Sequence, residues 1–312
     1  PSRLETWAAC PFKYFASSIL GLSGIDKPEQ LMTMSSLDRG SMVHKILELY
    51  VSQRIGRGRS DIETEKRSIL AVAESVFAEY ESRGVIGKAR LWVVVQARIR
   101  RELVRFVEFE IEQELETSFL AKDTEMRFGF GSDVSDAITL DLGDGQSISF
   151  RGFIDRIEES DDGRARVVDY KTGKADSYSG MKDDALQGGK RLQLPIYALA
   201  ARRKLKPAGD VVGEYWFTSE SGKIERKTVS LDELESDARN AIRRIITGIG
   251  EGVFPAIPGE YRFSTNSTAA GPYENCSFCD FDPICPVSRQ ADWDKKRRSS
   301  GVAPYFAEEE SE

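Results

Sequence analysis

Two carboxylates and one lysine lie in a segment, residues 152–171, whose pattern predicts a β-hairpin. Two runs of alternating apolar residues flank an Asp-Asp-Gly turn centred on Asp162. In a hairpin centred there, Asp155 lies directly opposite Asp169, unless a bulge in the turn shifts the register. Lys171 stands two residues beyond Asp169 and therefore projects from the same face. The sequence thus predicts two carboxylates and an ammonium group on one face of a sheet.

This arrangement favours a divalent cation. The same face carries Phe153, Ile157 and Val167, and two carboxylates among apolar neighbours repel each other and lose hydration. Mg²⁺ suits such a site because it takes one or two carboxylates and keeps several waters. The ion would polarise a phosphate and lower the pKa of a bound water, and Lys171 would orient that water or stabilise developing charge. The alternative is an ordinary surface hairpin with a salt bridge.

Three further residue types could support such a centre. His44 is the only histidine and lies on a predicted helix, where it is either a ligand or a structural residue. Gln193 and Tyr197 are four residues apart and share one helical face. Both can hydrogen-bond a phosphate or a base, although a buried tyrosine with a surface glutamine has the same spacing. Glu125 precedes the hairpin and either joins the carboxylates or stays solvated at a strand edge.

Four cysteines form a second candidate site. Cys276, Cys279 and Cys285 follow a C-x2-C-x5-C pattern, and Cys10 stands far upstream. No export signal indicates an oxidising compartment, so metal ligation is favoured over disulfides. The lone remote ligand and the Cys285-Pro286 ending favour a [4Fe–4S] cluster over zinc, the alternative occupant. Either group would staple the N-terminal helix to the tail, in a structural role or a redox role.

The elements that must position these residues follow in a clear order. Apolar periodicity predicts a helical region over 1–120, a sheet with flanking helices over 121–250, and an irregular cysteine-bearing tail over 251–312. The expected helices are 3–20, a segment from Ser35 or Ser36 to Gln53, 61–83, 88–120, 185–204 and 231–250, the last with a capping box of Ser230 and Glu233. The expected strands are 123–131, 137–142, 147–159, 164–171, 211–218 and 223–229.

The composition bounds the kind of protein. The chain has 312 residues, a net charge of −7 and no apolar run of the roughly 20 residues that a membrane span needs. The N-terminal residues lack an export pattern and a starting methionine, so we expect a cytoplasmic protein and a fragment of a longer one. Basic residues cluster despite the acidic balance, and each cluster is either a phosphate contact or a solvated face. These clusters are Arg98 to Arg105, Arg202 to Lys206 and Lys295 to Arg298.

In this order, the motifs resemble a known family. The series His44, Asp155, Asp169-Tyr170-Lys171 and Gln193 to Tyr197 resembles the RecB-type nucleases of the PD-(D/E)xK superfamily. The cysteine pattern is similar to that of AddB-type helicase–nucleases and of related CRISPR-adaptation nucleases. The resemblance covers the chain from Cys10 to Cys285. One departure is Ile154, which stands where the superfamily name has proline.

The resemblance implies roles for these residues and a fold. His44, Asp155, Asp169 and the Tyr170 carbonyl would bind the metal, and the four cysteines would bind a [4Fe–4S] cluster. The implied fold is a restriction-endonuclease-like mixed sheet flanked by helices, forming one nuclease domain over 1–312 with a helical N-terminal region. Lys171 would act in catalysis, together with the supporting residues Glu125, Gln193 and Tyr197.

The implied activity is that of a Mg²⁺- or Mn²⁺-dependent deoxyribonuclease. It would hydrolyse phosphodiester bonds, as an exonuclease on single-stranded DNA or DNA ends, within a helicase–nuclease of recombinational repair. No Walker-type loop occurs in the sequence, so a helicase domain or subunit would be a partner beside DNA. The alternatives are a catalytically silent DNA-binding module of such a complex and a zinc-stapled scaffold with no DNA role.

Overall fold

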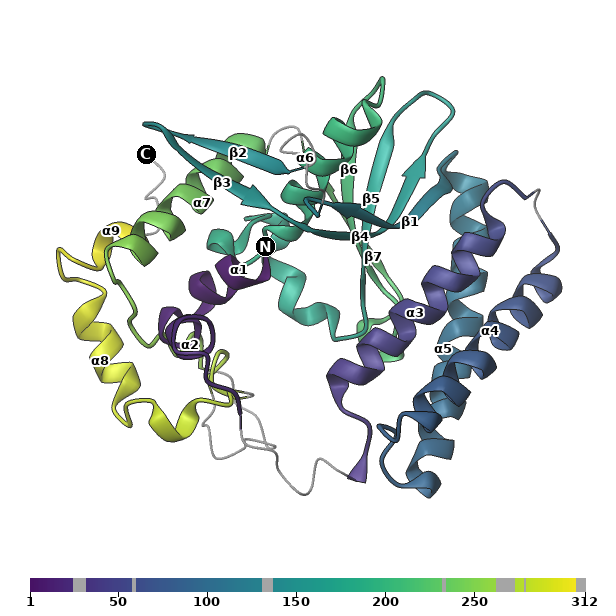
Figure 1. The fold of residues 1–312 in the computed structure, drawn as a ribbon, viewed down its shortest axis with the longest axis horizontal. Helices are drawn as coiled ribbons and strands as arrows, with labels where there is room; N and C mark the ends of the chain where they lie inside the picture. Colours follow the sequence, from purple (N-terminus) through teal and green to yellow (C-terminus); the bar gives the residue numbers. More distant parts are fainter. Residues whose placement is uncertain are drawn as a thin grey trace.

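The computed structural model describes residues 1–24, 32–57, 60–130, 137–231, 234–261, 273–277 and 279–306. Within these ranges the chain forms a mixed α/β fold, with helices on both sides of a central sheet (Figure 1). No helix among the described residues is both long enough and apolar enough to cross a membrane. Glu233 of the predicted capping box lies outside the described residues.

The central sheet has five strands in the order β1-β4-β5-β6-β7. Strands β5 and β6 are parallel and the other pairs are antiparallel, so the sheet is mixed. A separate two-stranded sheet joins β2 and β3. The strands are β1 (Leu120–Phe128), β2 (Ile138–Gly143), β3 (Gln146–Phe150), β4 (Gly152–Glu159), β5 (Ala165–Lys171), β6 (Val211–Phe217) and β7 (Arg226–Ser230).

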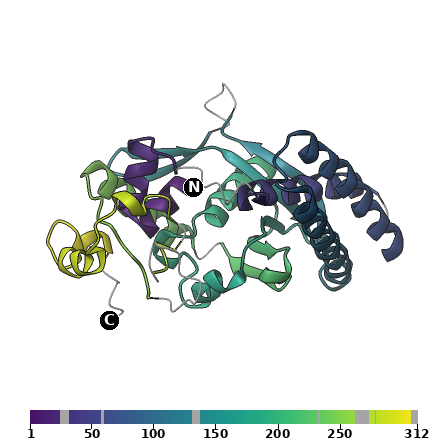
Figure 2. The same ribbon diagram turned by 90° about the horizontal axis from the view of Figure 1, so that it is seen from below.

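Three long helices cover one face of the sheet, as Figures 1 and 2 show. They are α3 (Ser36–Arg54), α4 (Ile62–Ser82) and α5 (Ala89–Glu116). Ser35 and Asp61 cap the first two by accepting hydrogen bonds from backbone N–H groups three residues on. Their apolar faces share one core with Val168, Tyr170 and Trp216 of the sheet.

The other face packs against a second core. Its helices are α1 (Ser2–Ala9), α6 (Gln193–Leu205) and α7 (Glu235–Gly250). Val167 on β5 and Tyr215 on β6 lie in this core, whereas their neighbours Val168 and Trp216 lie in the first, as strand alternation requires. Asp169 and Lys171 have the parity of Val167, so they project toward the α6 side.

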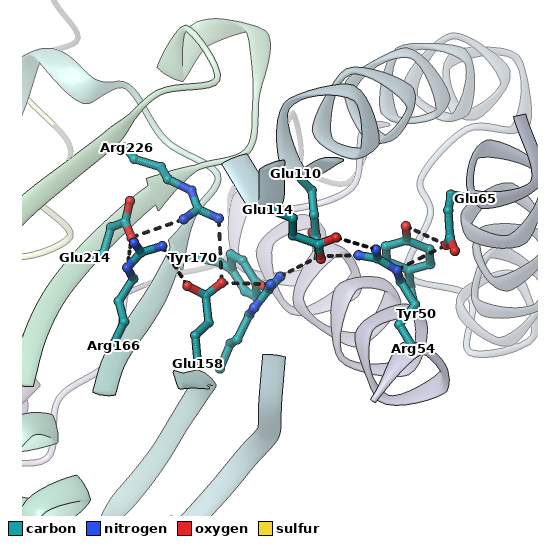
Figure 3. A network of polar contacts seen from close by, with 11 residues as sticks. Tyr50, Arg54, Glu65, Glu110, Glu114, Glu158, Arg166, Tyr170, Glu214 and Arg226 are labelled. Atoms are coloured by element: carbon teal, nitrogen blue, oxygen red, sulfur yellow. Dashed lines mark hydrogen bonds and ion pairs between the residues drawn. The ribbon is translucent and has the colours of Figure 1, made fainter. Parts of the chain in front are cut away.

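A network of buried charges lies between the sheet and the helical region (Figure 3). Arg156 on β4 is fully buried and pairs with Glu110 of α5 at 3.0 Å and with Glu158 at 2.7 Å. Trp216 packs against this network through the guanidinium of Arg226, 3.6 Å from its ring centroid. Paired in this way, the charges compensate each other in a setting where single charges would be costly. The remaining members are Arg54, Glu65, Glu114, Arg166 and Glu214.

The C-terminal tail packs against the N-terminal helices. The Trp7 ring of α1 stacks on Phe306 with centroids 5.1 Å apart, and Asn275 donates a hydrogen bond to the Ala9 carbonyl at 2.8 Å. The described part of the tail is less irregular than the sequence indicated, because it contains two short α-helices and a 3-10 helix at Asp282–Ile284. The two α-helices are α8 (Arg289–Lys296) and α9 (Ala303–Phe306).

Several predicted elements differ from the structure. The expected helix 3–20 is interrupted at Cys10, whose backbone is extended, so α1 ends at Ala9, α2 (Pro11–Tyr14) follows, and a π-helix covers Phe15–Ile19. The helix expected at 88–120 ends at Glu116, and Leu120 already belongs to β1.

The expected strand 147–159 is two strands that break at Arg151, because β3 pairs with β2 while β4 pairs with β1 in the central sheet. The expected helix 185–204 begins only at Gln193, since Gly188 and Gly189 have φ angles of +63° and +94°, outside the helical region. The helix expected at 231–250 begins at Glu235 without a side-chain cap.

Candidate metal centre and thiol cluster

Three potential ligands from three different elements meet at the edge of the sheet. One ligand atom each of His44 on α3, Glu125 on β1 and Asp155 on β4 lies within 4.8 Å of the others. An imidazole and two carboxylates are a suitable donor set for a divalent cation. All three are partly buried, so the site keeps access to solvent. The predicted ligands His44 and Asp155 are therefore adjacent, and Glu125 joins them.

The end of a strand ladder positions Asp155. The register of the hairpin pairs Arg156 with Val168, which confirms the turn centred on Asp162, and the ladder ends at that pair. Asp155 Oδ2 instead accepts a hydrogen bond from the Tyr170 N–H at 2.8 Å and lies 3.4 Å from His44 Nδ1. The carboxylate thus replaces a backbone partner where the two strands part.

Local backbone geometry also departs from a regular strand at this point. Ile154 and Ile157 both lie in the second core although they are three residues apart, so the alternation of β4 is interrupted next to Asp155. Across the ladder, Glu125 has a φ of +50°, which is strained for a residue with a side chain. Phe153 was expected among the buried neighbours of the carboxylates, but it is 41% exposed.

Asp169 and Lys171 form the second half of the site. The Lys171 ammonium pairs with the Asp169 carboxylate and donates a hydrogen bond to Gln193 Oε1 at 2.7 Å. The Asp169 side chain is only 4% exposed. Among the described residues, Asp169 is not part of the tight group around His44, because its carboxylate faces Lys171 instead.

The pKa values of these groups reflect a shortage of positive charge. Burial, and then the charge of Asp155, raise the pKa of Glu125 to about 7. Burial raises the pKa of Asp169 to about 6, with Lys171 opposing the shift and Asp155 adding to it. Burial lowers the pKa of His44, but the hydrogen bond to Asp155 and the charges of Asp155 and Asp169 together leave the pKa raised. A cation bound here would relieve the repulsion between the carboxylates.

Glu5 is a supporting residue that the sequence did not reveal. Its Oε1 accepts hydrogen bonds from the N–H groups of Leu192 at 2.7 Å and Gln193 at 3.1 Å, the free donors at the start of α6. Glu5 thereby fixes the start of α6, where Gln193, the hydrogen-bond partner of Lys171, is located. No local pattern could have indicated it, because 187 residues separate Glu5 from Leu192.

Tyr197 lies below the site rather than on its surface. It is 7% exposed, belongs to the second core and contacts the Phe128 ring at 6.1 Å. Burial raises its pKa, with further contributions from Asp169 and Asp155. Of the two residues on this predicted helical face, Gln193 contacts Lys171 and Tyr197 packs beneath.

The basic cluster on α5 is compensated by acidic side chains. Arg98 pairs with Glu102 at 3.1 Å and Arg100 pairs with Glu74 at 2.7 Å. Two further arginines of the cluster share one acidic partner, since Arg101 and Arg105 lie 3.6 and 3.9 Å from Glu220. This cluster is therefore a surface of ion pairs.

The four cysteines are free thiols that lie close enough to influence one another. Burial is the largest cause of the raised pKa of Cys10, and the nearby thiols of Cys279 and Cys276 raise it further. Burial raises the pKa of Cys285 to about 11 against the opposing charge of Arg289, and the other three thiols contribute. The fold thus brings Cys10 to the distant cysteine motif.

The spacing of these sulfurs is wider than a zinc site requires. A Zn–S distance of about 2.3 Å in a tetrahedron places thiolate sulfurs about 3.8 Å apart. In the part of the chain that the structure describes, no three of the cysteine sulfurs lie within 4.8 Å of one another. The four thiols are therefore near one another without forming the arrangement of a closed tetrahedral zinc site.

Comparison with known proteins places this geometry in a family. A profile of the PD-(D/E)XK nuclease superfamily matches residues 1–286. The chain is 30% identical over 178 residues to a subunit of the ATP-dependent helicase/deoxyribonuclease of Clostridium perfringens, covering 55% of the chain and 15% of that protein. Identity to the subunit of the same name from Moorella thermoacetica is 29% over 220 residues, covering 68% of the chain and 18% of that protein.

The match to the family profile is consistent with the observed mixed α/β fold. The matched region includes the mixed sheet, the His44–Glu125–Asp155 group and the cysteine motif. The chain spans less than a fifth of the length of these curated relatives. The chain belongs to the PD-(D/E)XK nuclease superfamily.

Proposed function

We propose that this chain is a Mg²⁺- or Mn²⁺-dependent deoxyribonuclease that hydrolyses phosphodiester bonds. The observation that carries this proposal is the convergence of His44, Glu125 and Asp155 beside the Asp169–Lys171 pair. This set supplies oxygen and imidazole ligands on one side and a positively charged side chain on the other. A DNA-binding module without catalytic activity would not need both the metal ligands and the lysine.

The residues divide into those that hold the ion and those that act on the substrate. His44, Glu125 and Asp155 would hold it, with Asp169 and the Tyr170 carbonyl as further ligands. When bound, the ion polarises the phosphate and lowers the pKa of a water. Lys171, held by the Gln193 side chain, stabilises negative charge that develops on the phosphate.

The proposed substrate is single-stranded DNA or a DNA end, cleaved as an exonuclease. The relatives are subunits named for both helicase and deoxyribonuclease activity, which supports a helicase domain or subunit as the partner. We place the activity in recombinational DNA repair in the cytoplasm. DNA is the second partner.

We assign a [4Fe–4S] cluster to Cys10, Cys276, Cys279 and Cys285, with zinc as the alternative. All four donors are thiols, and their spacing is not that of a closed tetrahedral zinc site. When bound, the group links Cys10, between α1 and α2 (Pro11–Tyr14), to the tail. Its role would be to hold the N-terminal helices against the tail.

Cleavage of end-labelled single-stranded DNA tests the nuclease proposal. The protein is purified anaerobically and assayed with Mg²⁺ or Mn²⁺ and with EDTA, beside Asp169→Ala and Lys171→Ala. We expect metal-dependent cleavage that both substitutions abolish while the circular dichroism spectrum is unchanged. Full activity in either variant would refute the site. A folded wild-type protein that binds DNA without cutting it would indicate the silent module.

A further inference from the structure

Two exposed phenylalanines lie beside the proposed metal centre. Phe130 stands two residues after the end of β1 and is 42% exposed, and Phe153 on β4 is 41% exposed. No other phenylalanine in the described ranges is as exposed. Their ring centroids are 5.1 Å apart, with the planes tilted by 43°. Isolated exposed apolar residues are common, but a contacting aromatic pair forms a continuous apolar surface with two ring faces.

Two arginines frame this aromatic pair. The Arg127 guanidinium lies 5.0 Å from the Phe130 centroid and 5.6 Å from that of Phe153, and Arg151 lies 5.8 Å from Phe130. Such contacts hold a cation over an aromatic ring. Among the described residues neither arginine forms an ion pair, in contrast to the compensated arginines of α5. We call these four residues the Phe130–Phe153 platform.

The strand ladder fixes the distance from the platform to the metal centre. Arg127 pairs with Phe153, and the next pair, Met126 with Ile154, is buried in the second core. One position further along the two strands stand Glu125 and Asp155, two of the candidate ligands. Two residues of a strand span about 6.6 Å. This length is comparable to one nucleotide of an extended single strand.

We propose that the Phe130–Phe153 platform binds an unpaired nucleobase of the DNA strand whose phosphate lies at the metal centre. The inference rests on the proposed nuclease function and specifies its substrate. Aromatic rings accept any base because every base has a π face, and the two free guanidinium groups complement neighbouring phosphates. A base paired inside a duplex is not available for this stacking. The platform therefore selects strands whose bases are unpaired next to the cut.

Binding of two single-stranded oligonucleotides in EDTA tests the platform. One has all its bases, and the other has the same backbone with a run of abasic sites. We expect the wild-type protein to bind the base-containing strand more tightly. Phe153→Ala and Phe130→Ala should each weaken that binding about 5- to 150-fold, with little change for the abasic strand.

Further variants separate stacking from general apolar contact. Phe153→Trp keeps a flat ring and should retain binding, whereas Phe153→Leu keeps apolar volume and should behave as the alanine variant does. Leu115→Ala removes an even more exposed apolar residue of α5 and should bind both strands as the wild type does. Unchanged circular dichroism spectra would exclude a folding defect.

Three outcomes would overturn the platform. The wild-type protein could bind both strands equally, the phenylalanine variants could weaken both strands equally, or they could keep the full preference for bases. A separate measurement tests the nuclease proposal, namely metal-dependent cleavage that Lys171→Ala should abolish. A failed platform with intact cleavage therefore leaves the function standing.

Discussion

At the scale of single residues, the candidate metal centre is defined by unfavourable charge. Glu125 and Asp169 keep their protons to a higher pH than ordinary carboxyl groups do, because burial and Asp155 disfavour their ionised forms and raise their pKa values to about 7 and about 6. A divalent cation removes this disadvantage by supplying the missing positive charge. Metal binding and proton release are therefore linked at this site.

This linkage predicts how the effect of Mg²⁺ on stability changes with pH. The pKa values of about 7 for Glu125 and about 6 for Asp169 in the folded protein exceed the unfolded values of about 4. Their contribution to stability is present below about pH 4 and is lost as the pH rises through 6 and 7. Mg²⁺ should therefore raise the Tm more at pH 8 than at pH 5. An equal shift at both pH values, measured by scanning calorimetry against EDTA, would contradict this.

At the scale of elements, the hairpin could be predicted and the supporting contacts could not. The turn at Asp162 and the alternating runs on either side predicted the register from local signals alone, as far as the pair of Arg156 and Val168. Asp155 and Asp169 were expected directly opposite each other, but they lie beyond the last pair of the ladder, where Asp155 accepts a hydrogen bond from Tyr170 instead. The long-range contacts were beyond such signals, as the Glu5 bond to the start of α6 shows. α6 begins later than predicted because Gly188 and Gly189 adopt a left-handed conformation. Glycine permits this conformation but does not require it, so the sequence alone could not predict the late start.

Removal of the Glu5 cap should lower both stability and turnover. Glu5→Ala leaves two N–H groups of α6 unpaired and should cost about 1 kcal/mol of unfolding free energy. It also loosens Gln193, and through it Lys171, so kcat should fall several-fold more than KM rises. Asp61→Ala is the matched control, since it removes the cap of α4 away from the site. Stability should fall in both variants, and an equal fall in kcat would refute the specific role of Glu5.

The buried charge network between β4 and α5 should be sensitive to the loss of one member. Arg156→Met removes the fully buried partner that Glu110 and Glu158 share, leaving Glu110 with Arg54 and Glu158 with Arg166, and should cost about 3–5 kcal/mol. Arg100→Met breaks an exposed pair with Glu74 and should cost less than about 1 kcal/mol. Urea denaturation measures both. A mild effect for Arg156→Met would show that the network relaxes or admits water.

At the scale of the whole molecule, contacts between distant parts of the chain hold the site together. The proposed metal ligands come from α3, β1 and β4, and Glu5 of α1 caps the start of α6. The tail in turn holds α1, through Trp7 and Phe306 and through the approach of the cysteine motif to Cys10. Local sequence patterns identified each thiol but could not show this arrangement.

Replacement of any one cysteine should remove the bound group and destabilise the contact between the two ends. Cys10→Ser and Cys279→Ser should lose visible absorbance and iron to the same extent, because each removes one of four equivalent ligands. Both should lower the Tm of the anaerobically purified protein. A colourless wild-type protein that contains one zinc per chain would contradict the iron–sulfur assignment. Ultraviolet–visible spectra and metal analysis distinguish the two cases.

The Glu5 contact has a consequence for the order of synthesis. Every residue proposed to hold the ion or contact the phosphate precedes residue 198, but the segment that secures α1 and its Glu5 is translated after all of them. A ribosome-bound chain that still lacks residues 273–306 would contain the full proposed catalytic set, with α1 held by earlier contacts such as the Trp7 hydrogen bond to the Val253 carbonyl but without the contacts of Phe306 and Asn275. The proposed nuclease activity would therefore reach its full level only after that segment has been translated.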